Sequence, residues 1–486
     1  MNSPRITFKT LNYRLLAALV LLSLALTPLA SVGPGASPST EFIVQAEDMA
    51  SAEALVEQVG GTITYELGII DAVGAELTGS QLAALQRLDG LKIYEDRQVE
   101  VAGKAGDDTF YPTLIGADRL HAEGITGSDV TVAIVDTEFG REEGRRPAEL
   151  NRNTNGDHRL LQVKWFVTGC PYPCEVYSGH GTHVGSIIAS SGQAKDGKYH
   201  GVAPDVNIVI VRAFNDGGAG TYGSVISGID WVVSRKESLN IRVLNLSFSA
   251  SPQSYYWDDP LNQAVMRAWQ AGIVVVAAAG NSGPDPMTIG VPGNVPYIIT
   301  VGAMTDNYTP GEGSDDYLAS FSATGPTVEG FVKPEVVAPG GHMIGIMPKT
   351  GRIPVEHPEF FDGGKYFTMS GTSQAAAVAS GVAALMLQAD PTLTPDEVKC
   401  RLMDAARPAQ DGNGALAYSI FQQGAGMVNA YDAVYSAVSG CANQGINIDN
   451  DLAGIQHYAG RANRDAGGNY FIMDPNGDPV DMDGYA

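Results

Sequence analysis

The segment Val130-Thr-Val-Ala-Ile-Val-Asp136 decides the fold, because it is apolar almost throughout and ends on an acidic residue. Similar apolar runs occur at 208–211, 243–246 and 273–278, and helix-like segments alternate with them. Continuous apolar strands separated by helices indicate a mostly parallel sheet with both faces covered. We therefore predict an α/β domain over residues 104–438, with functional sites where strands end and helices begin.

Residues 41–103 follow a different pattern, in which short strands and two helices alternate. The expected order is a strand at 42–44, a helix at 50–59, two strands up to 77, a helix that opens at Thr78, and a strand at 92–94. This β-α-β-β-α-β order predicts a small ferredoxin-like α+β domain. An ordinary N-terminal binding domain would show the same pattern and remains the alternative.

The N-terminus carries Arg5, Lys9 and Arg14, followed by the uncharged apolar run 15–30. This arrangement predicts a secretory signal peptide over residues 1–33, so we expect a secreted protein with no membrane contact after the signal is removed. An uncleaved membrane anchor is the alternative, but the sixteen apolar residues fall short of the roughly 20 that a bilayer core requires. The net charge of −24 would repel nucleic acid and argues against it as a partner.

The last residues, 439–486, lack a helical period and are rich in aspartate. Five of their side chains could offer oxygen ligands to calcium, although Pro479 stands where an EF-hand-type loop needs glycine: Asp474, Asn476, Asp478, Asp481 and Asp483. A solvated acidic C-terminal tail is the favoured interpretation.

The four cysteines form an even set in a chain that we expect to be exported, where disulfides persist. Local pairing, Cys170 with Cys174 and Cys400 with Cys441, is favoured, although four cysteines allow three connectivities. A zinc site is the alternative, but the chain has no Cys-x-x-Cys and no histidine at finger spacing.

Three short segments supply an acid, a base and a nucleophile. Asp136 ends an apolar strand, His180 lies in a glycine-rich segment, and Ser373 begins a run of small residues that predicts a buried helix. Serine is a weak nucleophile that needs an imidazole to take its proton and a carboxylate to orient that imidazole. Metal ligation by His180 and His183 is disfavoured, because zinc-binding helices place paired histidines four residues apart with a glutamate between them. We expect His183 to be a packed, hydrogen-bonded residue.

The order Asp, His, Ser and the surrounding motifs resemble the subtilisin-like (subtilase) serine proteases. The motifs are Tyr366-Phe-Thr-Met-Ser-Gly-Thr-Ser-Gln-Ala-Ala-Ala, Ser178-Gly-His-Gly-Thr-His-Val-Gly, Val276-Ala-Ala-Ala-Gly-Asn-Ser-Gly and Lys333-Pro-Glu-Val-Val-Ala-Pro-Gly, and the resemblance spans about residues 115 to 438. It implies a subtilisin-like three-layer fold and an endopeptidase in which Ser373 attacks, His180 is the general base, Asp136 orients it, and Asn281 belongs to the oxyanion hole.

The same resemblance implies where substrates bind and how the enzyme matures. Two segments would line the primary specificity pocket, namely Ser247, Phe248 and Ser249 together with Ala278, Ala279 and Gly280. Residues 41–103 would be a propeptide that assists folding, inhibits the enzyme from within the same chain, and is released by autocleavage near Val101 to Lys104. The expected partners are protein or peptide substrates. No organic cofactor is required, and structural calcium is expected without assigned ligands.

Four residues depart from the family pattern: Glu138, Ser249, Gln374 and Ala377. A charged Glu138 next to the triad would favour the imidazolium form of His180, so we expect a more alkaline activity profile than that of an E138G variant. The hydroxymethyl group of Ser249 would narrow the pocket and disfavour bulky aromatic P1 residues. These departures also motivate a rival interpretation, a subtilase-shaped scaffold without activity. An esterase or peptide ligase that uses the same site also remains open.

Overall fold

A computed structural model describes residues 39–88, 90–96, 98–101, 111–141, 144–167, 177–305, 316–474 and 476–480. The chain divides into two compact units, Met1–Ser39 and Thr40–Ala486, and nearly all described residues belong to the second. The predicted signal peptide, residues 1–33, and both Cys170 and Cys174 lie outside the described residues. The described part of the chain contains no helix with the length and apolar character needed to span a bilayer.

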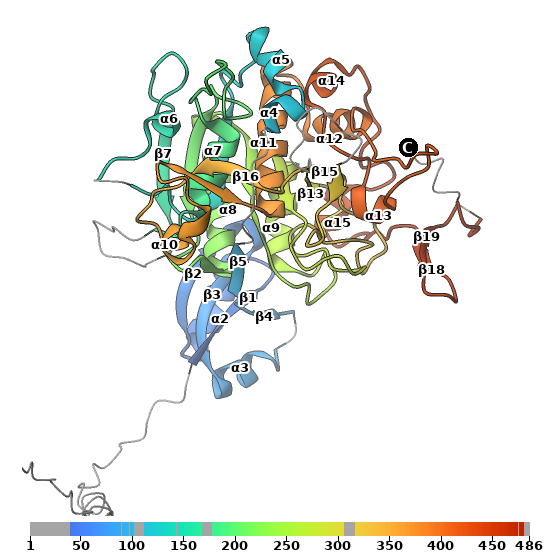
Figure 1. Cartoon of the computed structure of the whole chain (residues 1–486). Coiled ribbons are helices and arrows are strands. Elements are labelled where there is room, and N and C mark those ends of the chain that lie inside the picture. The colour runs from blue at the N-terminus through green and yellow to red at the C-terminus, as the bar shows by residue number, and fades with distance from the viewer. Residues whose placement is uncertain are drawn as a thin grey trace, which may run out of the picture. The chain divides into compact units, whose positions relative to one another are not determined.

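The N-terminal region has the predicted βαββαβ order and is drawn in blue in Figure 1. Its elements are β1 (Ser39–Gln45), α2 (Met49–Gln58), β2 (Thr62–Leu67), the 3-10 turn η1 (Gly68–Ile70), β3 (Ala72–Thr78), α3 (Gly79–Leu85) and β4 (Lys92–Glu95). The strands form one four-stranded sheet in the order β2-β3-β1-β4. Val44, Val56 and Leu85 are among the residues of a separate small core between this sheet and its helices.

The second region is built on a central sheet that is eight-stranded within the described residues. Its main path runs β14-β13-β12-β10-β6-β8-β7, β15 pairs with β13, and the pairs are parallel except β13 with β14. The strands are β6 (Thr131–Asp136), β7 (Leu160–Trp165), β8 (Asn207–Arg212), β10 (Ile241–Leu246), β12 (Val274–Ala278), β13 (Ile299–Thr305), β14 (Tyr317–Leu318) and β15 (Val336–Pro339). Every residue of β6 is buried, as expected for a strand covered on both faces.

Two pairs of helices cover this sheet, α7 (His180–Ala189) with α11 (Thr372–Ala389) and α8 (Tyr222–Leu239) with α9 (Pro260–Gln270). The prediction of a mostly parallel α/β sheet between helical layers is therefore confirmed. Further helices are α4 (Tyr111–Leu114), α5 (Ala117–Ala122), α6 (Ala148–Asn151), α10 (Arg352–Glu356), η2 (Pro358–Phe360), α12 (Pro395–Asp404), α13 (Ile420–Gln423) and α14 (Ala430–Tyr435). The antiparallel pair β16 (Met343–Ile346) and β17 (Tyr366–Met369) leads into α11.

The residues after 438, expected to form a solvated acidic tail, contain regular elements in their described part, and most of these residues are exposed. This C-terminal segment, residues 439–480, contains α15 (Ile448–Leu452) and the hairpin of β18 (Ala462–Arg464) and β19 (Tyr470–Ile472). A disulfide joins Cys400 to Cys441, in agreement with the favoured pairing. Asp451 is 2% exposed and accepts hydrogen bonds from the hydroxyls of Tyr256 and Tyr297 at 2.5 and 3.0 Å.

Candidate active site

The candidate site begins at Asp136, the last residue of β6, and His180, the first residue of α7. His180 Nδ1 lies 2.9 Å from each carboxylate oxygen of Asp136, and both side chains are fully buried. A carboxylate placed in this way fixes the tautomer of the imidazole, with the proton on Nδ1. The close approach requires Gly181, because a Cβ there would lie 2.3 Å from the Thr137 carbonyl oxygen.

Ser373 occupies the first turn of α11, which is buried along nearly its whole length, as the run of small residues predicted. The first turns of α7 and α11 lie in contact, since Gln374 Nε2 is 3.4 Å from His183 Nδ1. The Ser373 hydroxyl donates to the Ser247 carbonyl oxygen at 2.8 Å, and among the described residues it has no hydrogen bond to His180. The structure therefore pairs Asp136 with His180 and places the Ser373 hydroxyl on the Ser247 carbonyl oxygen.

His183 has the structural role that we expected from the sequence. Its Nε2–H donates to the carbonyl oxygens of Phe367 and Met343, at 3.0 and 3.2 Å. Burial lowers the pKa of His183 to about 4, so the ring stays neutral and serves as a packed link between α7 and the β16–β17 pair. The described residues contain no group of three or more His, Cys, Asp or Glu side chains that could hold a metal ion. Structural calcium stays a prediction without ligands, since Asp481 and Asp483 lie outside the described residues.

Asn281 follows β12 and is tied to the same helix terminus as Ser373. Its Oδ1 accepts hydrogen bonds from the backbone N–H and the hydroxyl of Thr372, at 3.0 and 2.9 Å. This orientation of the carboxamide leaves the Nδ2 hydrogens for another acceptor. The backbone N–H of Ser373 also has no hydrogen-bond partner among the described residues. This is common, because the first N–H groups of a helix have no acceptor within the helix. Asn281 thus contacts the residue that precedes Ser373 at the N-terminus of α11.

The six predicted pocket residues lie on two neighbouring segments near Ser373. Ser247 and Ser373 exchange two hydrogen bonds. The Ser247 hydroxyl donates to the Ser373 carbonyl oxygen at 2.9 Å, and the Ser373 hydroxyl donates to the Ser247 carbonyl oxygen at 2.8 Å. Phe248 and Ser249 form the short strand β11 (Phe248–Ser249), while Ala278, Ala279 and Gly280 end β12 and continue from it. A Cβ added to Gly280 would lie 3.2 Å from Ser249 Oγ, and one on Gly290 would lie 2.9 Å from Ser249 Cβ. The Ser249 side chain thus lies close to both glycines, and its role in narrowing the pocket stays a prediction.

A strand from the N-terminal region occupies the edge of β11. The strand β5 (Gln98–Val101) is the middle strand of a three-stranded sheet, between β11 and β9 (Ala219–Thr221), and both pairs are antiparallel. Val101 pairs with Phe248 and Glu100 pairs with Ser249. The end of β5 thus lies one register position from Ser247, the residue bonded to Ser373. The rest of the predicted cleavage window, residues 102–104, lies outside the described residues.

Glu138 has charged partners that the sequence did not reveal. Its side chain is 1% exposed and forms an ion pair with Arg146, while Arg141 Nη2 lies 3.5 Å away. The fully buried Arg212 is the register neighbour of Asp136 on the adjacent strand β8, and its Nη1 lies 3.9 Å from Glu138 Oε2. The negative charge at Glu138 is therefore matched by guanidinium groups, so its net influence on His180 is smaller than an isolated carboxylate would exert.

The carboxylate of Asp136 lies at a strand end, and the imidazole of His180 and the hydroxyl of Ser373 lie at two helix N-termini. This layout is that of a serine hydrolase. The model of the subtilase family matches residues 127–426. Serine protease AprX of Bacillus subtilis (strain 168) is 35% identical over 391 residues, which cover 79% of this chain and 84% of that protein. Subtilisin DY of Bacillus licheniformis is 32% identical over 318 residues, which cover 65% of this chain and 94% of that protein. The chain therefore belongs to the subtilase family of serine proteases.

A solved structure supports the fold. The crystal structure of fervidolysin from Fervidobacterium pennivorans aligns with a TM-score of 0.63 at 23% sequence identity and covers 84% of this chain and 62% of that one. At this identity the match supports the subtilisin-like fold alone.

Proposed function

We propose that the protein is a secreted serine endopeptidase, made as a self-processing zymogen, that uses Asp136, His180 and Ser373. The observation that carries this proposal is the pair of 2.9 Å contacts between His180 Nδ1 and the Asp136 carboxylate, next to the helix terminus that bears Ser373. Because both side chains are fully buried, water does not compete for this interaction.

In the proposed reaction, Ser373 Oγ attacks the carbonyl carbon of the scissile peptide bond while His180 Nε2 takes the hydroxyl proton. Asp136 keeps the Nδ1 proton in place and stabilises the imidazolium that forms. The oxyanion accepts hydrogen bonds from the Ser373 backbone N–H and Asn281 Nδ2, which Thr372 holds in position. His180 then protonates the leaving amine, and a water molecule, activated by the same imidazole, hydrolyses the acyl-enzyme.

We propose that protein and peptide substrates bind in an extended conformation between β9 and β11, as β5 does. Backbone hydrogen bonds to both strands would hold the chain, and side-chain pockets would select the sequence. A bound segment that reaches Ser247 brings its next peptide bond to the Ser373 hydroxyl, which is bonded to the Ser247 carbonyl oxygen.

Residues 41–103 would act as the propeptide. Its docking is supported by three contacts with the protease domain. Asp96 accepts a hydrogen bond from the Gly223 N–H at the start of α8, Lys92 pairs with Asp258, and Gln45 donates to Gln263. Since Val101 pairs with Phe248, we propose cleavage after the residue that follows, Ala102, which lies inside the window predicted from the sequence and moves the C-terminal boundary of the propeptide from residue 103 to residue 102. A first mature residue other than Gly103 would contradict this assignment.

The test of the protease assignment is labelling with a fluorophosphonate probe, together with the intact mass of the secreted product. We expect the wild type to become labelled, and the S373A variant to stay unlabelled and to accumulate as the unprocessed chain. A wild-type protein that folds but never becomes labelled would instead support the inactive scaffold. Assays with peptide, ester and amine-acceptor substrates separate an endopeptidase from an esterase or a ligase, and the mass also tests removal of residues 1–33.

A further inference from the structure

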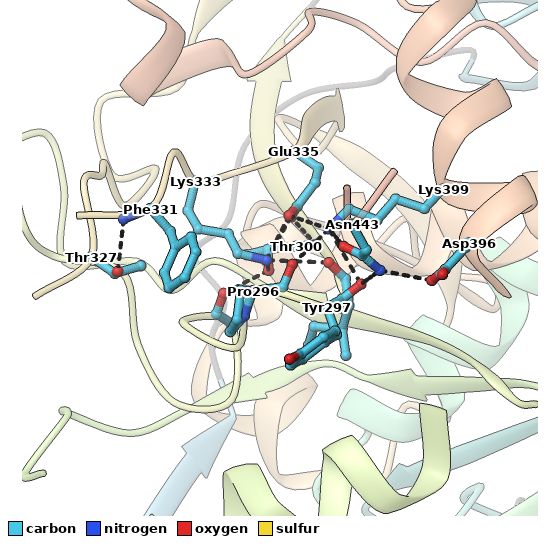
Figure 2. A network of polar contacts seen from close by, with 12 residues as sticks. Pro296, Tyr297, Thr300, Thr327, Phe331, Lys333, Glu335, Asp396, Lys399 and Asn443 are labelled. Carbon is cyan, nitrogen blue, oxygen red and sulfur yellow. Dashed lines mark hydrogen bonds and ion pairs between the residues drawn. The ribbon is translucent and has the colours of Figure 1, made fainter. Parts of the chain in front are cut away.

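Two buried lysines share one carboxylate, as Figure 2 shows. Lys333 Nζ lies 2.6 and 2.9 Å from the two carboxylate oxygens of Glu335, and Lys399 Nζ lies 2.8 Å from Oε1. The three side chains are at most 6% exposed. Buried ionisable groups are tolerated only when they are paired and hydrogen-bonded, so this Lys333–Glu335–Lys399 network has little freedom to rearrange.

One end of the network is held by Asn443 of the C-terminal segment. Asn443 Oδ1 accepts from Lys399 Nζ at 3.1 Å, and Asn443 Nδ2 donates to Asp396 Oδ1 at 2.7 Å and to the Tyr297 carbonyl oxygen at 3.0 Å. The carboxamide therefore uses both of its ends, one toward a lysine and one toward a carboxylate. The Cys400–Cys441 disulfide lies beside this contact in the sequence and fixes the segment to α12.

The other end of the network holds Thr300 in β13. Glu335 Oε2 accepts from the Thr300 backbone N–H at 2.8 Å, and Lys333 Nζ donates to Thr300 Oγ1 at 3.1 Å. The Thr300 hydroxyl in turn donates to the Gly293 carbonyl oxygen at 2.6 Å. Because the hydroxyl has a single proton, the lysine on its acceptor side directs that proton to Gly293.

Gly293 ends a segment that borders the predicted specificity pocket, and we call residues 290–293 the pocket wall. The Gly290 N–H donates to the Ala279 carbonyl oxygen at 2.9 Å, and Val291 exchanges two backbone hydrogen bonds with Ala250, at 2.8 and 2.9 Å. Gly290 also approaches the side chain of Ser249. The pocket wall thus joins both segments that we expect to contact the P1 side chain.

We propose that Asn443 and Thr300 are positioning residues for substrate selection, through which the C-terminal segment fixes the pocket wall by way of the Lys333–Glu335–Lys399 network. This inference rests on the proposed protease function. It gives the C-terminal segment a role in specificity although none of the network side chains touches the triad. Loss of either residue frees the pocket wall to move away from Ser249, so the pocket admits larger P1 side chains.

The test uses the full-length secreted enzyme with N443G, T300V and the double variant. Asn443 has a φ of +55°, which glycine adopts without cost, so N443G removes the carboxamide and leaves the backbone conformation acceptable. T300V removes the hydroxyl at nearly constant volume. N463A removes an exposed carboxamide from the same segment, far from the network in sequence, and is the matched control.

Peptides that differ only in alanine or phenylalanine at P1 are compared, with active sites counted by fluorophosphonate labelling. We expect N443G and T300V each to lower the Ala/Phe ratio of kcat/KM by about threefold or more, mainly through a lower KM for the phenylalanine peptide. The double variant should add little to either single variant, because both interrupt one chain of contacts. N463A should keep the wild-type ratio.

A wild-type Ala/Phe ratio in both N443G and T300V, with only a lower melting temperature, overturns the positioning role and leaves the protease assignment intact. Independent, additive effects of the two substitutions overturn it as well. Absence of labelling in the wild type itself would remove the proposed function, so the two failures are distinguishable. Should N443G fail to fold, N443A replaces it, because T300V alone tests only the contact between Thr300 and Gly293.

Discussion

Ser249 offers the sharpest test of the substrate pocket, because its side chain is the one that stands between two glycines. A Cβ on Gly290 would lie 2.9 Å from Ser249 Cβ, and a Cβ on Gly280 would lie 3.2 Å from Ser249 Oγ. The S249G variant removes both the Cβ and the Oγ from this gap. Backbone pairing of β11 is unaffected, since glycine keeps the same N–H and carbonyl groups.

The expected size of the effect follows from the volume removed. One methylene group in an apolar pocket changes discrimination by about 10–200-fold. S249G removes a methylene and a hydroxyl, so kcat/KM for a phenylalanine P1 peptide should rise relative to that for an alanine peptide by a factor in this range. Small P1 residues should lose little, because they do not reach the space that Ser249 fills.

The assay is a peptide library that varies only P1, read out as kcat/KM for the wild type and for S249G. The exposed Ser251, two residues further along the chain, provides the control, and S251G should keep the wild-type profile. A wild-type enzyme that already prefers phenylalanine or tyrosine would refute the reasoning. So would an S249G profile that matches the wild type, because the side chain would then not face the substrate.

Three further predictions concern charges. E138Q should shift the acid limb of the kcat/KM profile to lower pH and R146Q to higher pH, because each leaves the other's charge unmatched beside the triad; equal shifts in one direction would contradict this. Burial raises the pKa of Asp96 to about 7, so propeptide docking is favoured at low pH and weakens as the pH rises toward 7. Activity assayed at one fixed pH should therefore appear faster after preincubation at pH 8 than at pH 5.5, and D96N should lose most of this difference. Burial lowers the pKa of Lys333 to about 7, below its unfolded value of 10.5, so the free energy of unfolding should rise with pH between these two values. Chemical denaturation at several pH values should show a smaller rise for K333M than for the wild type.

The sequence was enough to predict those helices, strands and site residues whose signal lies in a short local pattern. Local sequence was enough to predict three features: the apolar run before Asp136, the small residues after Ser373 and the alternation of strands and helices in residues 41–103. Each of these patterns can be recognised within a single helix or strand and its immediate neighbours. The residues that follow the strands could also be placed from the sequence, because the carboxyl ends of parallel strands lie at the same edge of the sheet. The position of Asn281 just after β12 is an example.

The parts that escaped prediction depend on contacts between distant residues. Arg212 and Arg146 reach Glu138 from β8 and from the loop before α6, and neither carries a local signal that marks it as a partner. The same holds for Asn443, whose partners Lys399 and Asp396 lie more than forty residues away along the chain. Ordinary polar residues of this kind acquire a role only when the fold brings them together.

The C-terminal segment shows what average composition leaves unspecified. Its acidic character favours a solvated tail, but one buried carboxylate decides how it docks. The carboxylate of Asp451 accepts hydrogen bonds from two tyrosine hydroxyls, and its Oδ1 lies 2.7 Å from His457 Nδ1. These protein groups take the place of water around the buried carboxylate. Burial and the adjacent carboxylate both raise the pKa of Tyr256 and Tyr297, which keeps both hydroxyls protonated as donors across the physiological range. A docked segment held in this way can keep Asn443 beside Lys399, which is the condition that its proposed role in the pocket requires.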